Sequence, residues 1–199
     1  RVQAGATPPS TQSPGSPTEQ TTVTDEVRQQ LITQIGQLLT QTRQQFASGA
    51  HTVGNDTIVP MQPGHDHRYV VDLNAGAMYG FIGACDGDCT NVDIELISMT
   101  TGGVVASDML PDDYPVVQFT PPADGQYMVR TLLQNCSVAP CYVGSRALAM
   151  PAGWAQTSNL RRRAGAGAKK PALWPRKTTL CVSRPANCGM RAHGWMRQR

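Results

Sequence analysis

The sequence predicts a mainly β protein: an antiparallel, jelly-roll-like β-sandwich that follows one N-terminal amphipathic helix and is flanked by disordered tails. Three observations predict this fold class. From residue 55 onward, apolar and polar residues alternate with a period of two, which is typical of half-buried strands. Turn sequences rich in Gly, Pro, Asn and Asp separate about eight such runs. Before them, residues 24–47 repeat apolar side chains at helical spacing.

The first segment, residues 1–22, is rich in Pro, Ser, Thr, Gln and Gly and is predicted to be a flexible linker. The chain opens with Arg1, and no apolar stretch of the signal-peptide type follows it. We therefore expect that a signal peptide has been removed, or that the sequence begins downstream of one.

Residues 23–48 are predicted to form the helix. Thr24 is a suitable N-cap, and Asp25 and Glu26 place negative charge in the first turn, where the helix dipole favours it. The apolar stripe of such a helix more often packs on its own domain than on a partner or a membrane. The opposite face is rich in glutamine, and Gly49 is a plausible end.

Residues 55–149 are predicted to form the sandwich. The expected strands are listed in chain order: Thr57–Met61, Arg68–Asn74, Met78–Ala84, Val92–Ser98, Val104–Ser107, Val116–Thr120, Gln126–Leu133 and Tyr142–Ala149. Four aromatic residues are expected to be core residues rather than a ligand platform: Tyr79, Phe81, Tyr127 and Tyr142.

Charge divides the chain into two unlike parts. Residues 1–150 contain six basic and 14 acidic residues, a net charge of −8, whereas residues 151–199 contain eleven basic and no acidic residues, a net charge of +11. The apolar residues of this last segment follow no period, so residues 150–199 are predicted to be a basic tail of low order. We favour disorder, or translation out of frame from GC-rich DNA, over a basic arm that binds nucleic acid or anionic lipid.

Four cysteines lie in the predicted sandwich, in two pairs that each flank a short loop: Cys85 with Cys89, and Cys136 with Cys141. Four cysteines allow three pairings, and spacing alone does not choose among them. We favour the two local disulfides, each worth about 2 kcal/mol in the chain-entropy model. A four-thiolate zinc site is the alternative, but both pairs are spaced more widely than the usual zinc turn. Disulfides predict a secreted or periplasmic protein.

Three segments carry patterns known from a bacterial family. His67–Tyr79 contains an early Y-x-h-x-h strand (h is apolar), Val92–Leu96 reads as a D-h-E-L strand, and Asp124–Arg130 contains a late G-x-Y-x-h strand. Together they resemble the pre-peptidase C-terminal domain. This resemblance implies a non-catalytic accessory module of the kind often attached to secreted peptidases.

Three further segments are similar to uncharacterised secreted bacterial proteins. They are the C-D-x-D-C run at Cys85–Cys89, the D-D-x-P-V-V run at Asp112–Val117, and the closing C-x4-C-Y run at Cys136–Tyr142. In such proteins the sandwich closes the chain soon after its last strand. This similarity implies that the chain beyond Met150 is foreign to the fold.

Four side chains with oxygen ligands lie within eight residues, beside the predicted Cys85–Cys89 disulfide: Asp86, Asp88, Asn91 and Asp93. Calcium binds about six to eight oxygens, and a short rigid loop lowers the cost of gathering them. These residues are therefore a candidate calcium site, and calcium is the one cofactor that the sequence suggests. The alternative is a solvated acidic turn in which Asp86 and Asp88 accept hydrogen bonds from backbone amides.

No catalytic motif is found: there is no G-x-S-x-G elbow, P-loop or G-x-G-x-x-G, and the protein is predicted not to be an enzyme. The first hypothesis is a secreted binding or assembly module whose ligand is an extracellular protein or polysaccharide. The alternatives are an accessory or pro-domain of a secreted peptidase system, and a structural subunit that forms a homo-oligomer through helix 23–48. No nucleic-acid partner is predicted, and no run of eighteen apolar residues predicts a membrane span.

Overall fold

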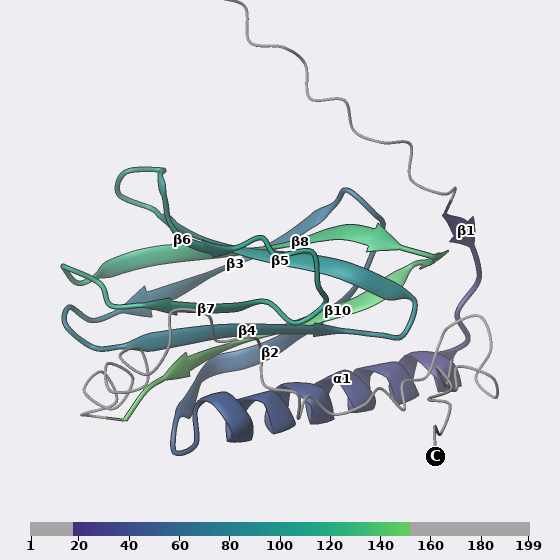
Figure 1. Cartoon of the computed structure of the whole chain (residues 1–199), viewed down its shortest axis with the longest axis horizontal. Helices are drawn as coiled ribbons and strands as arrows, with labels where there is room; N and C mark the ends of the chain where they lie inside the picture. Colours follow the sequence, from purple (N-terminus) through teal and green to yellow (C-terminus); the bar gives the residue numbers. More distant parts are fainter. Residues whose placement is uncertain (1–17, 152–199) are drawn as a thin grey trace, which may run out of the picture.

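The computed structural model describes residues 18–151, which fold into three layers. Figure 1 shows two stacked β-sheets, with one helix lying along the outer face of the second sheet. The elements, in chain order, are β1 (Glu19–Gln20), α1 (Asp25–Phe46), β2 (His51–Met61), β3 (Asp66–Leu73), β4 (Tyr79–Cys85), β5 (Cys89–Ser98), β6 (Val104–Asp108), β7 (Val116–Phe119), β8 (Gly125–Cys136), β9 (Val138–Ala139) and β10 (Cys141–Ala149). Nearly all of the predicted linker and basic tail lie outside the described residues.

The strand order is that of a jelly roll. One sheet has the order β2-β10-β4-β7 and the other has the order β3-β8-β5-β6, and all neighbours in them are antiparallel. If these eight strands are counted in chain order, the sheets read 1-8-3-6 and 2-7-4-5, the order of a double-sheet jelly roll. The predicted fold class, an antiparallel jelly-roll-like sandwich with one N-terminal helix, is confirmed.

The largest differences from the predicted strands are an early start of β2 and an additional short pair; β5 and β8 also extend by three residues at one end. β2 begins at His51, six residues before the expected start at Thr57, and pairs with β10 across a register shift. The short strands β1 and β9 form a parallel pair that was not predicted. Two-residue strands have no period to detect. The first half of β2 lacks alternation because most of its residues are exposed and none is buried.

The strands β4 and β10 are covered on both faces. All seven residues of β4 and eight of the nine residues of β10 are buried. One face of this sheet packs on the other sheet, and its opposite face packs on α1. This double burial explains why β4 reads as a continuous run of apolar and small residues, whereas β5 alternates.

The core between the sheets is built from apolar residues of both. Its buried members are Val71, Leu73, Tyr79, Phe81, Ile94, Leu96, Val117, Tyr127, Val129 and Ala147. Three of the four aromatic residues expected in the core lie here, and the fourth, Tyr142, is buried beneath α1. The prediction that these rings are core residues is confirmed.

The helix begins and packs as its sequence predicts. The Thr24 hydroxyl accepts a hydrogen bond from the Val27 amide at 3.4 Å, and Asp25 and Glu26 stand in the first turn. Leu31 and Ile35 are fully buried against the β2-β10-β4-β7 sheet. Because the apolar stripe is used within the chain, a homo-oligomer through helix 23–48, which stays a prediction, would have to use the polar face.

Arg146 of β10 lies beneath the helix and is only 7% exposed. Its Nε and Nη2 atoms donate to the two carboxylate oxygens of Asp56 at 2.7 and 2.6 Å, and its Nη1 donates to the Thr40 hydroxyl at 3.2 Å. A two-pronged contact of this kind satisfies the guanidinium despite its burial. The ion pair therefore joins β2, β10 and α1 at a single point.

Candidate functional site

The disulfide end of the sandwich contains both local disulfides that the sequence favours. One joins Cys85 to Cys89 across the β4–β5 turn, and the other joins Cys136 to Cys141 between β8 and β10. Cys89 and Cys136 are register partners on neighbouring strands, so the disulfides lie close together in one small core cluster. No free cysteine occurs in residues 18–151.

The four calcium candidates fall into two pairs with different surroundings. The carboxylate of Asp86 is buried and accepts hydrogen bonds from the amides of Tyr142, at 2.6 Å, and Asp88, at 3.2 Å. The Asp88 carbonyl accepts hydrogen bonds from the amide and the hydroxyl of Ser137. These contacts tie the β4–β5 turn to the segments around β9. The amide contacts of Asp86 are those of the alternative described above, but Asp86 and Asp88 are both buried and not solvated.

Asn91 and Asp93 lie on β5, and each has one buried side-chain oxygen with no hydrogen-bond partner among the described residues. The second oxygen of Asp93 accepts a hydrogen bond from Gln134 at 2.6 Å. Within residues 18–151, no set of three or more His, Cys, Asp or Glu side chains is arranged to hold a metal ion.

Calcium binding stays a prediction. If calcium binds here, the melting temperature is expected to be higher in millimolar calcium than in chelator. An unchanged melting temperature would contradict calcium binding.

Burial raises the pKa of Asp93, and the nearby carboxylates of Asp108, Glu95 and Asp112 add to this effect, whereas the hydrogen bond from Gln134 opposes it. A carboxyl group with a raised pKa in the folded state binds its proton more tightly there than in the unfolded chain. Its ionisation therefore costs stability as the pH rises from its ordinary pKa of 3.8 through the raised value.

We therefore expect Asp93→Asn to raise the free energy of unfolding at pH 7, in chelator, because the variant has no carboxylate to ionise in this buried position. The gain should disappear below the ordinary pKa of 3.8, where both proteins carry a neutral group at this position. Urea unfolding at neutral and acid pH measures it, with Asp72→Asn, an exposed position on β3, as the control. A gain that persists unchanged in acid would contradict the electrostatic explanation.

A charged network crosses the β3-β8-β5-β6 sheet. One carboxylate oxygen of Asp66 accepts hydrogen bonds from Arg68 at 2.7 Å and from Arg130 at 2.6 Å, and Arg130 also contacts Glu95 at 3.0 Å. The hydrogen bond from Arg68 is the main reason why the pKa of Asp66 is lowered. Because the two signs neutralise each other locally, this network does not favour a ligand of one charge.

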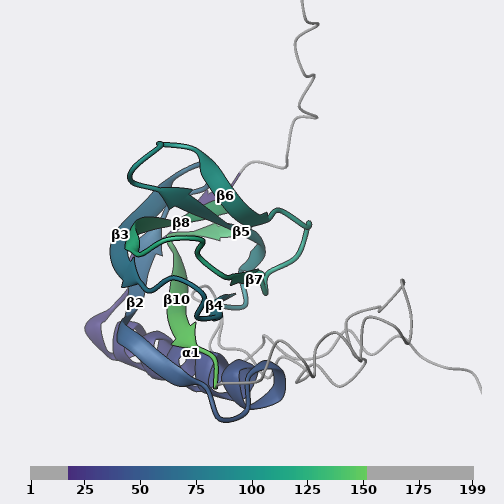
Figure 2. The same cartoon turned by 90° about the vertical axis from the view of Figure 1, so that its left-hand side faces the viewer.

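The most unusual surface lies at one edge of the same sheet, around the edge strand β6. Among residues 18–151, six large apolar side chains are exposed, and five of them are contributed by β6 and the two loops that flank it. We call these five the β6 patch: Met99, Val104, Val105, Met109 and Leu110. Their exposed fractions run from 39% to 56%. The sixth, Val70, lies on β3 at the opposite edge of the sheet, as Figure 2 shows for the two strands.

The sequence prediction missed the β6 patch. The strand Val104–Ser107 was expected, but nothing in it indicates that it ends a sheet. A signal is present in hindsight: from Met99 to Leu110 the only charged residue is Asp108. Edge strands usually carry Lys or other charges that prevent pairing with another chain.

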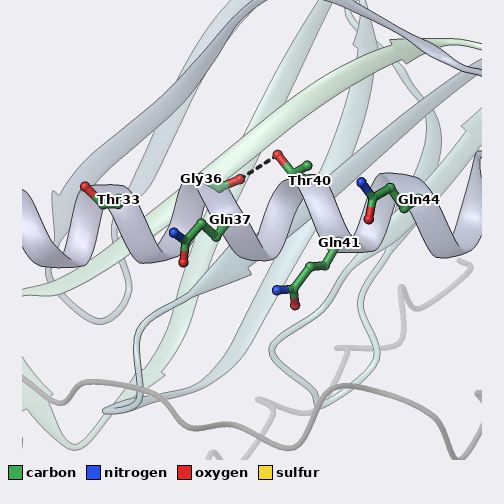
Figure 3. Close-up of a pocket in the computed structure, with 6 residues that line it drawn as sticks. All are labelled: Thr33, Gly36, Gln37, Thr40, Gln41 and Gln44. Atoms are coloured by element: carbon green, nitrogen blue, oxygen red, sulfur yellow. Dashed lines mark hydrogen bonds between the residues drawn. The ribbon is translucent and has the colours of Figure 1, made fainter.

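A shallow groove of about 370 Å³ runs along the polar face of α1. Figure 3 shows its lining, in which the Thr40 hydroxyl donates a hydrogen bond to the Gly36 carbonyl. The other lining residues are Thr33, Gln37, Gln41 and Gln44. Ligand sites are usually apolar clefts with a few polar groups. This groove consists of hydroxyl and amide groups on a single helix, so it offers little apolar surface to bury.

A second cleft of about 430 Å³ lies where β2 and β3 meet, and His65 and His67 help to line it. Between them stands Asp66, whose carboxylate is already bound by two arginines. The cleft therefore lacks a carboxylate that is available to polarise either imidazole.

The single helix of residues 18–151 does not meet the length and hydropathy that a membrane-spanning helix requires.

Comparison with known proteins gives likenesses of fold alone. No family model matches the chain, and no curated protein matches it. One solved structure with a similar fold is PliG of Aeromonas hydrophila, a periplasmic inhibitor of g-type lysozyme; it is 16% identical, the match covers 52% of this chain and 90% of that one, and the TM-score is 0.36. Another is a CBM4 structure, which is 12% identical; the match covers 54% of this chain and 82% of that one, and the TM-score is 0.33. Such low scores do not transfer a function, and the resemblance to the pre-peptidase C-terminal domain stays an expectation.

Proposed function

We propose that this protein is an extracytoplasmic, non-catalytic binding module that binds protein partners through the β6 patch. The observation that carries the proposal is the concentration of exposed apolar side chains at one strand and its flanking loops. Apolar patches of this kind on a folded domain typically mark interaction surfaces. Two disulfides in the described residues support an oxidising compartment.

A protein partner fits the patch better than a polysaccharide does. None of the six exposed large apolar side chains is aromatic, and the ring-bearing residues Tyr79, Phe81 and Tyr127 are buried. A flat aromatic ring is the usual platform for the apolar face of a sugar, whereas flexible Met and branched Val or Leu side chains adapt to irregular protein surfaces.

The backbone of β6 adds a second means of recognition. In its sheet, β6 pairs with β5, and no described strand is hydrogen-bonded to its other edge, although β7 of the facing sheet lies close to β6. β6 contains neither Lys nor Pro, and the carboxylate of its single charge, Asp108, accepts hydrogen bonds from the amides of Leu110 and Val116. An open strand edge bordered by apolar side chains suits an extended peptide, which adds to the sheet as a further strand.

The test is selection from a displayed random library of peptides of about twelve residues, a length that covers the strand and both loops. We expect enriched peptides with alternating apolar residues that bind the oxidised protein with a Kd on the order of 10 µM. Val105→Lys should weaken their binding about tenfold or more, because it places a charge within the patch.

The control is Val70→Lys, the same substitution at the opposite edge of the same sheet, where the side chain is also about half exposed. It should leave peptide binding unchanged. Failure to enrich any peptide, or peptides that bind Val105→Lys as well as the wild type, would contradict the proposed function. The accessory role beside a secreted peptidase rests on the family resemblance and stays a separate prediction.

A further inference from the structure

We infer that the natural occupant of the β6 patch is a second copy of this chain, bound by antiparallel pairing of β6 with β6 about a two-fold axis. The inference rests on the proposed function and deepens it by naming the partner. Pairing of this kind would join two four-stranded sheets into one continuous eight-stranded sheet. What supports it is the way in which the patch is distributed along the strand.

The apolar side chains gather at both ends of β6. Val104 and Val105 begin the strand, and Met109 and Leu110 follow its last residue. In an antiparallel pair, the start of one strand lies beside the end of the other. A two-fold axis at Ser107 therefore places Val105 of each copy opposite Met109 of the other, and Val104 opposite Leu110, so the patch is complementary to itself.

The middle of the strand does not oppose this arrangement. Ala106 and Ser107 are small and uncharged, so two copies can approach closely at the axis. The charge of Asp108 is held by amides of its own chain at 3.2 and 2.8 Å. Like charges directly opposite each other, the common obstacle to strand pairing, are therefore absent from β6.

The backbone at the loop end also leaves room. Gly102, with φ of +70°, has open space where a side chain would stand. The register irregularity between β5 and β6 lies at Leu96 and Ile97, opposite the first residues of β6. The segment from Ala106 to Asp108 pairs regularly with β5, so its outer edge can extend the sheet.

The experiment is sedimentation equilibrium of the full oxidised chain over a wide concentration range. Two short strands make an interface below the standard size, so we expect a reversible dimer with a Kd on the order of 100 µM. Val105→Lys and, separately, Met109→Asp should each weaken the dimer at least about tenfold. Val70→Lys should dimerise like the wild type. Far-ultraviolet circular dichroism and melting temperature confirm that each variant is folded.

A mixture of Val105→Lys and Met109→Asp makes the test specific for the two-fold arrangement, because these two positions lie opposite each other across the proposed pair. In a mixed dimer one contact joins the two introduced charges, which are opposite in sign, and the other contact is the native one. The mixture should therefore recover most of the dimer that neither variant forms alone. A mixture that remains monomeric would overturn the proposed pairing geometry, and so would a dimer that Val105→Lys leaves intact.

Failure of the dimer does not imply failure of the proposed function. A wild-type protein that stays monomeric up to about 1 mM overturns the second copy as the occupant. The binding role of the patch then depends on the peptide selection, performed at protein concentrations far below any dimer Kd. Dimerisation with no selected peptide would show that the patch serves assembly alone.

Discussion

Gly144→Ala should lower the free energy of unfolding by about 2–3 kcal/mol, because β10 offers the helix no room for a side chain at this position. A Cβ at residue 144 would collide with the Cγ2 of Ile35 and come within 3.3 Å of Leu39. Ile35 is β-branched and lies in a helix, so its side chain has one strongly preferred rotamer and cannot swing away. Relief requires that the whole helix move outward from the sheet.

Urea unfolding measures this effect, and Gly36→Ala is its matched control. Gly36 lies on the polar face of α1, and a Cβ there meets no atom within 4 Å. The same chemical change should therefore raise stability by about 1 kcal/mol through helix propensity. Two alanine variants that shift stability in the same direction would contradict the close packing of α1 on β10.

Asp56→Ala should lower the free energy of unfolding by about 2–3 kcal/mol, because it leaves the guanidinium of Arg146 buried without its carboxylate. The pair is short, at 2.6 Å, and Arg146 lies beneath the helix, although the Asp56 side chain is 25% exposed. This partial exposure keeps the expected loss at the lower end for buried ion pairs.

The second variant removes both charges. Adding Arg146→Met to Asp56→Ala should recover most of the loss, since an apolar side chain of similar length needs no ionic partner. Asp25→Ala, which breaks the exposed contact between Asp25 and Arg28, should cost less than about 1 kcal/mol. Chemical denaturation of the wild type and the three variants measures these free energies of unfolding. Equal losses of stability in Asp56→Ala and Asp25→Ala would refute the role of burial.

The parts of the fold that follow a local period could be predicted. Val92–Leu96 alternates because β5 has one face in the core, and the stripe through Leu31 and Ile35 repeats because α1 packs along one side. The N-cap at Thr24 and the two local disulfides depend on neighbours a few residues away. The residues that form the N-cap and each disulfide lie close together in the sequence, so their interactions can be predicted from it.

The candidate site was less predictable, because its properties depend on strand order. The Asp86 carboxylate turned out to bind the Tyr142 amide, 56 residues away, and no spacing within the C-D-x-D-C run reveals that contact. Val105 reads as an ordinary strand residue. Only the sheet order places it at an open edge, with the rest of the β6 patch around it.

By itself, the sequence determined the fold class, the single amphipathic helix and the contrast in charge between residues 1–150 and residues 151–199, and it favoured the two local cysteine pairs. Periodicity, caps and composition act over a few residues and can be read directly from the chain. Only the tertiary structure decided which strand ends a sheet, where α1 rests on Gly144, and how Arg146 reaches Asp56 across 90 residues. These features arise from the pairing of distant segments, whose energy depends on contacts that no local pattern encodes.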